Sequence, residues 1–431
     1  MKENLIETEY KHIYGEINSP FKLADEMISM FPDTYLTNPE LKWLDPGCGQ
    51  GNLTYRLFQT LTKNIQNKTH LLENMLHVVE LNDVRKPEIT AMFKECCPEA
   101  KPNITIGNIF NESALYDAII CNPPFNFSGK IKTPTTSNLV KKNDGFTVWC
   151  EFVRHCMSLL KDGGYMCFIV PAIWMKPDKA GMYNFLLNWK IERIKCYTNT
   201  ETNTLFAGQA QTPTSIFLVR KILQDPLATT NVLSIYSKKS EIYITHNLYK
   251  NLPIPMSNID LINKLQLYLP DKDHLKVKKT NMPSRTITFT AACTLSHPYK
   301  NIRTTKLVGR MDLGKPRLSD NTVEHIIEWS NKPCVGYGSG PKIIMAHKMY
   351  GMPFIDYTGD IGISNRDSYI IDGISIEELE RTYDLLNNTT IIKVYDATRY
   401  RMKYLEKYAF ELIPKITSDE LDGINILSII N

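Results

Sequence analysis

The sequence of 431 residues lacks several features that mark particular classes of protein. It contains no apolar run of the ~18 to 20 residues that a helix needs to cross a bilayer. Its ten cysteines include no Cys-x-x-Cys pair and its histidines show no metal-ligand spacing, so we expect neither a zinc site nor a redox motif. Its first residues carry acids and no apolar core of the kind found in signal peptides. We therefore expect an intracellular, cytoplasmic protein with reduced cysteines, no bound metal and no membrane anchor.

A strong excess of charge of one sign is also absent, because the net charge is only +4. The distribution is uneven, however: from Lys272 to Arg317 there are eleven Lys or Arg against two acids. Phe289, His297 and Tyr299 stand among these basic residues. The mixture fits a surface that contacts phosphates, although a merely solvated face would have the same composition.

The length exceeds that of a usual single domain, and we predict two domains, 1–250 and 251–431. The first alternates short apolar runs with helical patterns, which predicts an α/β fold with a mostly parallel, Rossmann-like sheet. After Pro253 the pattern becomes irregular and indicates a smaller α+β domain. The predicted strands are 41–45, 76–81, 104–106, 118–121, 165–170, 194–197 and 215–220; the predicted helices include 146–160, and 205–220 as a whole is predicted to form an antiparallel hairpin.

A glycine-rich turn follows the first predicted strand and comes before a helical pattern. Glycines let the backbone turn tightly and approach a ligand, and the amides at the start of the helix face that ligand. An acid at the end of the next strand, Glu80, is placed to accept ribose hydroxyls. The spacing of the glycines is not that of G-x-G-x-x-G, yet these residues alone leave a dinucleotide site open. The candidate cofactor-binding residues here are Asp45, Pro46, Gly47, Cys48, Gly49, Gly51, Glu80, Leu81, Asn108 and Ile109.

The tetrapeptide Asn122-Pro123-Pro124-Phe125 follows a predicted strand, at the edge of the sheet where open α/β folds bind ligands. An aryl amine is a poor nucleophile because its lone pair is delocalised into the ring. The Asn122 side-chain oxygen and the Pro123 carbonyl can accept its two hydrogens and free that lone pair. The prolines fix φ and remove competing amide donors, and Phe125 offers a face for stacking a base. The tetrapeptide therefore predicts methylation of a planar amine or amide.

These motifs, in this order, resemble the amino-methyltransferases of DNA, and most of all the gamma-class adenine enzymes of restriction-modification systems, of the TaqI and Eco57I types. The resemblance covers roughly 14–222. It implies S-adenosyl-L-methionine as cofactor, a cofactor role for Ser19 and Pro20, and a base-gripping role for Phe206. This sequence has Ser19 where the family has Thr, and Asn108 where the family usually has Asp.

The resemblance implies a DNA adenine-N6 methyltransferase that flips its target base out of the duplex. Its partner would be double-stranded DNA, with a separate restriction endonuclease as a further candidate, and we expect a monomer. Open alternatives are enzymes that methylate RNA adenine, the amide of a protein glutamine or the amine of cytosine, a catalytically silent DNA-binding subunit, and a nicotinamide-dependent dehydrogenase. We expect the polar stretch 126–143 to be a loop that closes on DNA. The candidate DNA-binding residues are Lys130, Lys132, Lys141, Lys142, Lys278, Lys279, Arg285 and Arg303.

Overall fold

The computed structural model of the chain divides into two units, Met1–Asn251 and Leu252–Asn431, and each is considered by itself. The residues that the structure describes are 13–125, 148–178, 180–224, 231–249, 251–268, 273–308, 311–312, 315–316, 322–347, 353–366, 368–401 and 405–415.

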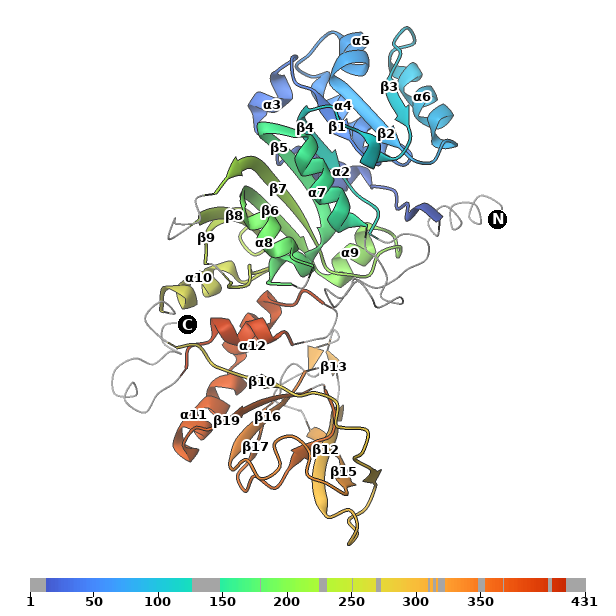
Figure 1. The fold of residues 1–431 in the computed structure, drawn as a ribbon. Coiled ribbons are helices and arrows are strands. Elements are labelled where there is room, and N and C mark those ends of the chain that lie inside the picture. The colour runs from blue at the N-terminus through green and yellow to red at the C-terminus, as the bar shows by residue number, and fades with distance from the viewer. Residues whose placement is uncertain are drawn as a thin grey trace. The chain divides into compact units, whose positions relative to one another are not determined.

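The first unit is built on a nine-stranded sheet in the order β3-β2-β1-β4-β5-β7-β6-β8-β9 (Figure 1). The first five strands in this order, β3, β2, β1, β4 and β5, each pair in parallel with the next. Strand β7 runs antiparallel to both of its neighbours, β5 and β6. The order reverses beside β1, which lies between β2 and β4, so a ligand crevice is expected at the carboxyl ends of these strands. The strands are β1 Trp43–Asp45, β2 Leu76–Glu80, β3 Asn103–Ile106, β4 Tyr116–Cys121, β5 Leu160–Pro171, β6 Trp189–Tyr197, β7 Thr214–Leu223, β8 Asn231–Ser237 and β9 Ile242–Leu248.

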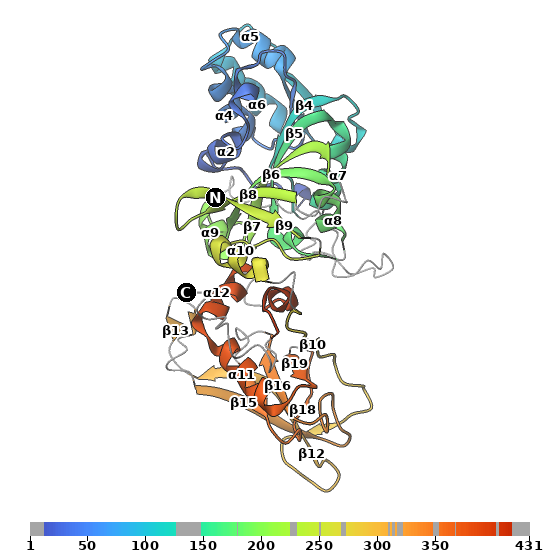
Figure 2. The ribbon, with the colours of Figure 1, turned by 90° about the vertical axis from the view of Figure 1, so that its left-hand side faces the viewer.

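Helices cover both faces of this sheet. In Figure 2, α2 and α4 lie on one side of the strands and α7 and α8 on the other. The α-helices are α2 Phe21–Ile28, α3 Asp33–Thr37, α4 Asn52–Leu61, α5 Lys68–His70, α6 Arg85–Cys96, α7 Trp149–Leu159, α8 Met182–Leu187 and α9 Asn199–Leu205. Shorter turns of other helix types are η1 Leu71–Met75, η2 Ile109–Asn111 and η3 Ala172–Met175.

Burial on both faces explains why the central strands read as continuous apolar runs. Ala118 and Ile120 of β4 belong to the core under α2 and α4, and the intervening Ile119 is equally buried. Alternate side chains of a strand point to opposite faces, so both faces of β4 are covered. Each large aliphatic side chain buried in this way contributes about 1.5 to 3 kcal/mol. This packing holds the strand ends in place.

The architecture confirms the predicted Rossmann-like α/β fold and each of the seven predicted strands. The predicted hairpin over 205–220 is wrong. Residue 205 ends helix α9, and β7 pairs with β5 and β6, the strands on either side of it in the sheet. The capping box of Thr198 and Glu201 starts α9, a helix that was not predicted. Strands β8 and β9, which extend the sheet, were not predicted.

The second unit is of α+β type. Its two four-stranded sheets have the orders β10-β19-β16-β17 and β11-β15-β12-β18, with one further strand pair, β13-β14. The strands are β10 Lys278–Lys279, β11 Phe289–Thr290, β12 Tyr299–Val308, β13 Met311–Asp312, β14 Lys315–Pro316, β15 Thr322–Ser330, β16 Lys342–Ala346, β17 Pro353–Asp356, β18 Gly362–Ile363 and β19 Ser368–Asp372. The helices are α10 Ile259–Tyr268, α11 Ile376–Asn387, α12 Thr389–Ala397 and the 3-10 turn η6 Lys407–Leu412. Within the described ranges, none of the helices of either unit is long and apolar enough to cross a membrane.

Candidate active site

Four polar side chains stand where four neighbouring strands end. Asp45 is the last residue of β1 and Glu80 the last of β2. Asn108 comes two residues after β3, and Asn122 directly after β4. Because the strands are parallel and adjacent in the order β3-β2-β1-β4, these residues form a row along one edge of the sheet: Asn108, Glu80, Asp45, Asn122.

A cavity of about 490 Å³ opens along this row, a size typical of cofactor sites. Of the sequence-predicted residues, those that line it are Ser19, Asp45, Pro46, Gly47, Cys48, Gly49, Glu80, Leu81, Asn108, Ile109, Asn122 and Pro124. The predicted residues Pro20, Gly51, Pro123, Phe125 and Phe206 are not part of this lining.

The glycine-rich turn has the backbone shape that its composition predicts. Gly49 and Gly51 adopt left-handed φ values of +56° and +83°. A Cβ on Gly51 would lie 2.9 Å from Met92 Cε, so a side chain there meets both backbone strain and the packing of α6. Gly51 supports the turn from behind, which explains why it does not line the cavity. The Gly49 amide donates a hydrogen bond to Glu80 Oε2 over 2.8 Å and joins the turn to the end of β2.

Asp45 is buried and only half satisfied. Its Oδ2 accepts a hydrogen bond from Thr54 Oγ1 at 2.6 Å, whereas its Oδ1 has no hydrogen-bond partner among the described residues. Burial raises the pKa of Asp45 to about 7, and the bond from Thr54 opposes that rise. A buried carboxylate oxygen without a partner is costly, which marks Oδ1 as an acceptor for a cationic ligand group.

The charges of the cavity are of one sign. Its lining includes four carboxylates, Glu16, Asp45, Glu80 and Glu151, and no Lys or Arg among the described residues. Burial raises the pKa of Glu80, whose two oxygens accept hydrogen bonds from the Gly49 and Asn82 amides. The cavity therefore suits a ligand with positive groups and disfavours one with a pyrophosphate.

The Asn122 amide is held in a single orientation. Its Nδ2 donates to the Ile17 carbonyl and to Ser19 Oγ, both at 3.2 Å. A carbonyl can only accept, so the nitrogen must face Ile17, and both Nδ2 hydrogens are then engaged. The side-chain oxygen Oδ1 is left on the other side of the amide as an acceptor.

Sequence reasoning missed most of the segment 14–19, which forms one wall of the cavity. Its Glu16 lies 2.8 Å from Arg85 Nη2, and the Ser19 carbonyl accepts a hydrogen bond from Asn52 Nδ2 at 3.1 Å. The resemblance implies a role here only for Ser19 and Pro20, and the local signal for the rest is an acid next to a glycine.

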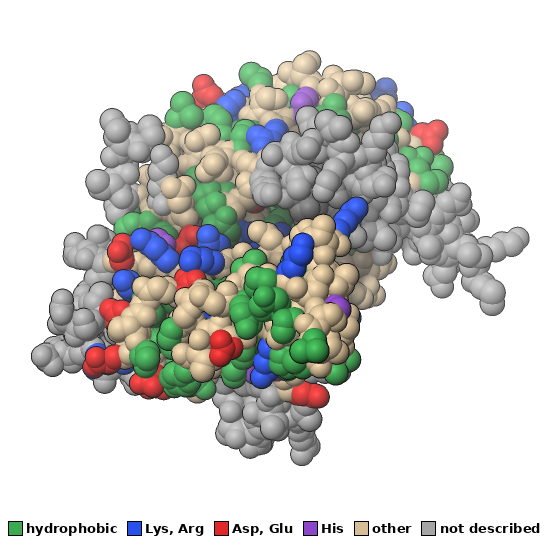
Figure 3. All heavy atoms as spheres, turned by 60° about the horizontal axis from the view of Figure 1, so that its bottom comes forward, with side chains coloured by type: hydrophobic (Ala, Val, Ile, Leu, Met, Phe, Trp, Pro, Cys, Tyr) green, Lys and Arg blue, Asp and Glu red, His purple; other side chains and the backbone are tan. Residues whose placement is uncertain are grey.

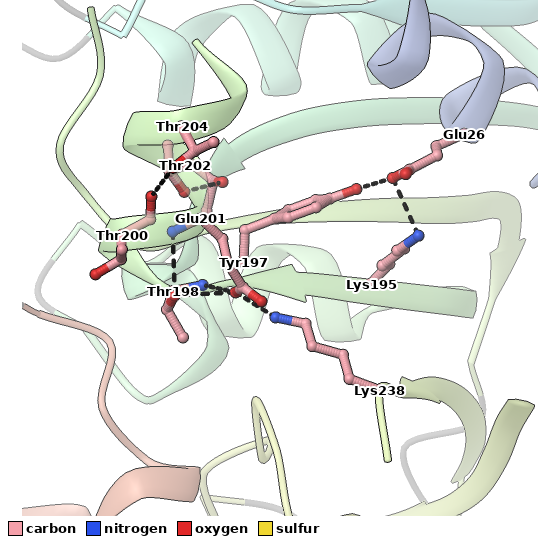
Figure 4. Close-up of polar contacts among 10 residues, drawn as sticks. Glu26, Lys195, Tyr197, Thr198, Thr200, Glu201, Thr202, Thr204 and Lys238 are labelled. Carbon is pink, nitrogen blue, oxygen red and sulfur yellow. Dashed lines mark hydrogen bonds and ion pairs between the residues drawn. The ribbon is translucent and has the colours of Figure 1, made fainter. Parts of the chain in front are cut away.

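A polar network holds α2, the helix that follows this wall. Glu26 of α2 accepts a hydrogen bond from Tyr197 and forms an ion pair with Lys195 at 3.0 Å (Figure 4). Lys238 of the segment after β8 pairs with Glu201 of α9. The contacts of Glu26 join α2 to β6, and the pair of Lys238 and Glu201 joins α9 to the segment after β8.

The end of the cavity near β3 is aromatic. Phe110 and Phe152, from η2 and α7, pack edge to face with centroids 5.5 Å apart. Asn108 Oδ1 already accepts a hydrogen bond from the Phe110 amide, which makes Asn108 part of a tight turn. His155 Nε2 contacts the Ile109 carbonyl at 2.9 Å and holds that turn against α7. The contribution of α7 was missed because nothing in its sequence pattern distinguishes a ligand-facing helix from a core helix.

In a comparison with known protein families, residues 30–203 match the model of the Eco57I restriction-modification methylase family. This segment is similar to that family. The match confirms the predicted resemblance to restriction-modification methyltransferases over these residues.

A Methanocaldococcus jannaschii protein, named as a type II restriction enzyme and methyltransferase, is 37% identical over 71 residues, which are 16% of this chain and 6% of that protein. Among solved structures, the type IIG restriction endonuclease BpuSI has a TM-score of 0.43 at 11% identity, covering 96% of this chain and 60% of its own. The ATP-dependent Type ISP restriction-modification enzyme LlaBIII, solved bound to DNA, has a TM-score of 0.45 at 12% identity, covering 94% of this chain and 39% of its own. At these TM-scores the likenesses support no conclusion about activity. The chain spans much less than the full length of these relatives.

Phe206 lies outside the matched segment 30–203 and does not line the cavity. Its side chain is 3% exposed and packs in the core of the first unit, at the end of α9. This burial is typical of a core residue, and the base-gripping role that the resemblance implies for Phe206 stays a prediction.

The predicted DNA-contacting residues fall into two groups. Lys130, Lys132, Lys141 and Lys142 lie outside the described residues. Lys278, Lys279, Arg285 and Arg303 are exposed in the second unit. Lys278 pairs with Asp372 at 2.7 Å, and Arg303 lies 3.9 Å from Glu328. The described residues contain no group of three or more His, Cys, Asp or Glu that could hold a metal ion.

Proposed function

We propose that this protein transfers a methyl group from S-adenosyl-L-methionine to the exocyclic N6 amine of an adenine in double-stranded DNA. The orientation of the Asn122 amide carries the proposal. Because both Nδ2 hydrogens are donated to Ile17 and Ser19, the group available to a substrate at Asn122 is the acceptor Oδ1. An enzyme that activates an amine needs an acceptor at this point, and one that binds a carbonyl would need a donor.

Asn122 Oδ1 and the Pro123 carbonyl would accept the two hydrogens of the adenine amine and draw its nitrogen toward tetrahedral geometry. Phe125, which is partly exposed, would stack on the base. When bound, S-adenosyl-L-methionine supplies a methyl group that is already activated on a sulfonium. The protein therefore has mainly to position and polarise the amine, and no titrating base is required.

The residues of the cavity fit S-adenosyl-L-methionine. Asp45 Oδ1, buried and without a partner among the described residues, would hold its ammonium group. Glu80 would accept from the ribose hydroxyls, and Asn108 with Ile109 would contact the adenine ring. The four carboxylates of the lining favour a cofactor with two cationic groups over a dinucleotide.

Residues 251–431 would contact the DNA phosphates and read the base sequence, because the exposed candidate DNA-binding residues, Lys278, Lys279, Arg285 and Arg303, lie there. An adenine inside a duplex must be flipped out to reach Asn122, at a cost of roughly a few kcal/mol. We further propose that the protein acts as a monomer in the cytoplasm and is accompanied by a separate endonuclease.

The test is a transfer assay with methyl-labelled S-adenosyl-L-methionine and unmethylated duplex DNA. Digestion to nucleosides should release labelled N6-methyladenine, and Asn122→Ala protein serves as the matched control. Label recovered only in RNA or protein would contradict the proposal. Labelled N4-methylcytosine would assign the cytosine amine instead, and DNA binding without any transfer would indicate a silent subunit.

A further inference from the structure

One leucine in the second unit is fully exposed at the apex of a turn. Leu295 lies in the loop 291–298 that joins β11 to β12, and its relative exposure is 105%. The loop ends in a tight turn, because Thr294 and His297 bond to each other through their backbones, with His297 N donating to Thr294 O at 3.0 Å. Leu295 and Ser296 are the two residues at the apex, so the leucine side chain projects into solvent.

The turn that carries Leu295 is braced by side chains. His297 contacts hydroxyl groups through both ring nitrogens, Ser296 Oγ at 3.0 Å and Thr288 Oγ1 at 2.9 Å. Thr288 is itself tied to Asn331, whose Oδ1 accepts a hydrogen bond from the Thr288 amide at 3.0 Å. The apex is thus connected to the segment before β11 and to the end of β15. A turn held this firmly presents its apical side chain in a defined place, unlike a leucine on a loose loop.

The composition of the sequence on both sides of Leu295 favours nucleic acid over protein as the partner. From His274 to Met311 the chain contains no Asp or Glu and eight Lys or Arg. Hydroxyl side chains are frequent in the loop and just before it, at Ser284, Thr286, Thr290 and Thr294. Lys, Arg, Ser and Thr are the side chains that contact the DNA backbone, whereas a protein interface would surround a leucine with further large apolar groups. On the face drawn in Figure 3, Lys and Arg side chains (blue) lie among hydrophobic ones (green), with several Asp and Glu side chains (red) between them.

We propose that Leu295 is a wedge that enters a base step of the duplex and partly unstacks it. Proteins that deform DNA insert a single apolar side chain between base pairs while polar groups on either side hold the backbone. Arg285 and the loop hydroxyls would hold the phosphates, and the braced turn would resist being pushed aside. This inference rests on the proposed function, and it adds a second distortion to the duplex beyond the flipped adenine.

The experiment uses the full chain and a duplex with its methylation site, located by sequencing DNA from expressing cells. 2-Aminopurine, which fluoresces when unstacked, replaces one purine at a time across the site and its flanks. The wild-type protein should raise fluorescence at the target adenine and at one other step. Leu295→Ala should abolish the second signal and weaken binding about tenfold, as expected for losing the burial of one leucine. Leu295→Phe should retain the signal.

Two controls separate the wedge from other roles. Leu267→Ala, which truncates another exposed leucine of the same unit, should change neither signal nor affinity. The salt dependence of binding should be the same for Leu295→Ala and the wild type, because no phosphate contact is lost, whereas Arg285→Ala should reduce its slope by about one.

Unchanged affinity and fluorescence in Leu295→Ala, with methylation intact, would overturn the wedge and leave the proposed function standing. Weaker binding with the second signal still present would also overturn it, because Leu295 would then contact DNA without unstacking it. Absence of any methyl transfer by the wild type would instead overturn the proposed function, and the wedge with it.

Discussion

At the carboxyl edge of the large sheet the charged side chains are buried and paired with backbone amides or hydroxyls, whereas those between His274 and Met311 stand mostly at the surface. Asp45 and Glu80 are 3% and 6% exposed, and Lys278 has 73% of its side chain exposed. Burial raises the pKa of both carboxylates and strengthens their interaction with a ligand that displaces water. The exposed basic residues interact weakly one by one and act through their number, by releasing counterions from DNA.

The two regions should therefore respond differently to substitution. At the sheet edge, a substitution that removes or moves one polar atom should lower the methyl-transfer rate or the cofactor affinity by a large factor. In the second unit, single charges should have small effects that depend on salt. The predictions below run from the largest effect to the smallest.

Asn122→Ala should lower the rate of methyl transfer about 10²- to 10³-fold, because it removes an acceptor needed by the amine in the transition state. Cofactor affinity, measured by calorimetric titration, should change little. An equal loss of cofactor binding would place Asn122 in the cofactor site and contradict its proposed role.

Ser19→Ala should lower kcat by about three- to tenfold, which is the value of one hydrogen bond, because Asn122 Nδ2 loses a partner at 3.2 Å. KM for the cofactor should stay constant, and Ser19→Thr, which keeps a hydroxyl, should restore the rate. A raised cofactor KM with unchanged kcat would return Ser19 to the cofactor role that the sequence resemblance implied.

Cofactor affinity should depend on pH through Asp45. Its pKa is raised to about 7, so the carboxylate loses its charge as the pH falls through that value. Affinity should then weaken by up to about tenfold per pH unit below the pKa and level off above it. Asp45→Asn should bind weakly at every pH; a pH dependence that survives in this variant would assign the effect to Glu80 or Glu16.

Charge reversal of Lys278 and Lys279 should weaken DNA binding a few-fold and flatten its salt dependence. The effect should be smaller than for two unpaired lysines, because Lys278 already forms an ion pair with Asp372. Affinity would be measured by fluorescence anisotropy across a salt series, with charge reversal of Lys86, an exposed lysine of the first unit, as the control. Unchanged binding at low salt would remove this patch from the DNA interface.

Much of the first unit could be predicted because its signals are local. A short apolar run followed by Asp45 and a glycine-rich turn describes a strand, its end and the start of a helix within a few residues. The same holds for Glu80 and for Asn122 with its two prolines. Residues that reach the site through packing had no such signal: Glu16 is an ordinary acid near the start of the chain, and Phe152 an ordinary apolar residue of α7.

The sequence by itself determined which chemical groups stand at the strand ends and, through the order of the motifs, the resemblance of residues 30–203 to restriction-modification methylases. Only the tertiary structure decided how those groups are used. It placed Ser19 against Asn122, left Asp45 Oδ1 without a partner among the described residues, and buried Phe206 in the core. The physical reason is that side-chain orientation and burial depend on contacts between segments far apart in the chain, which no local pattern of residues records.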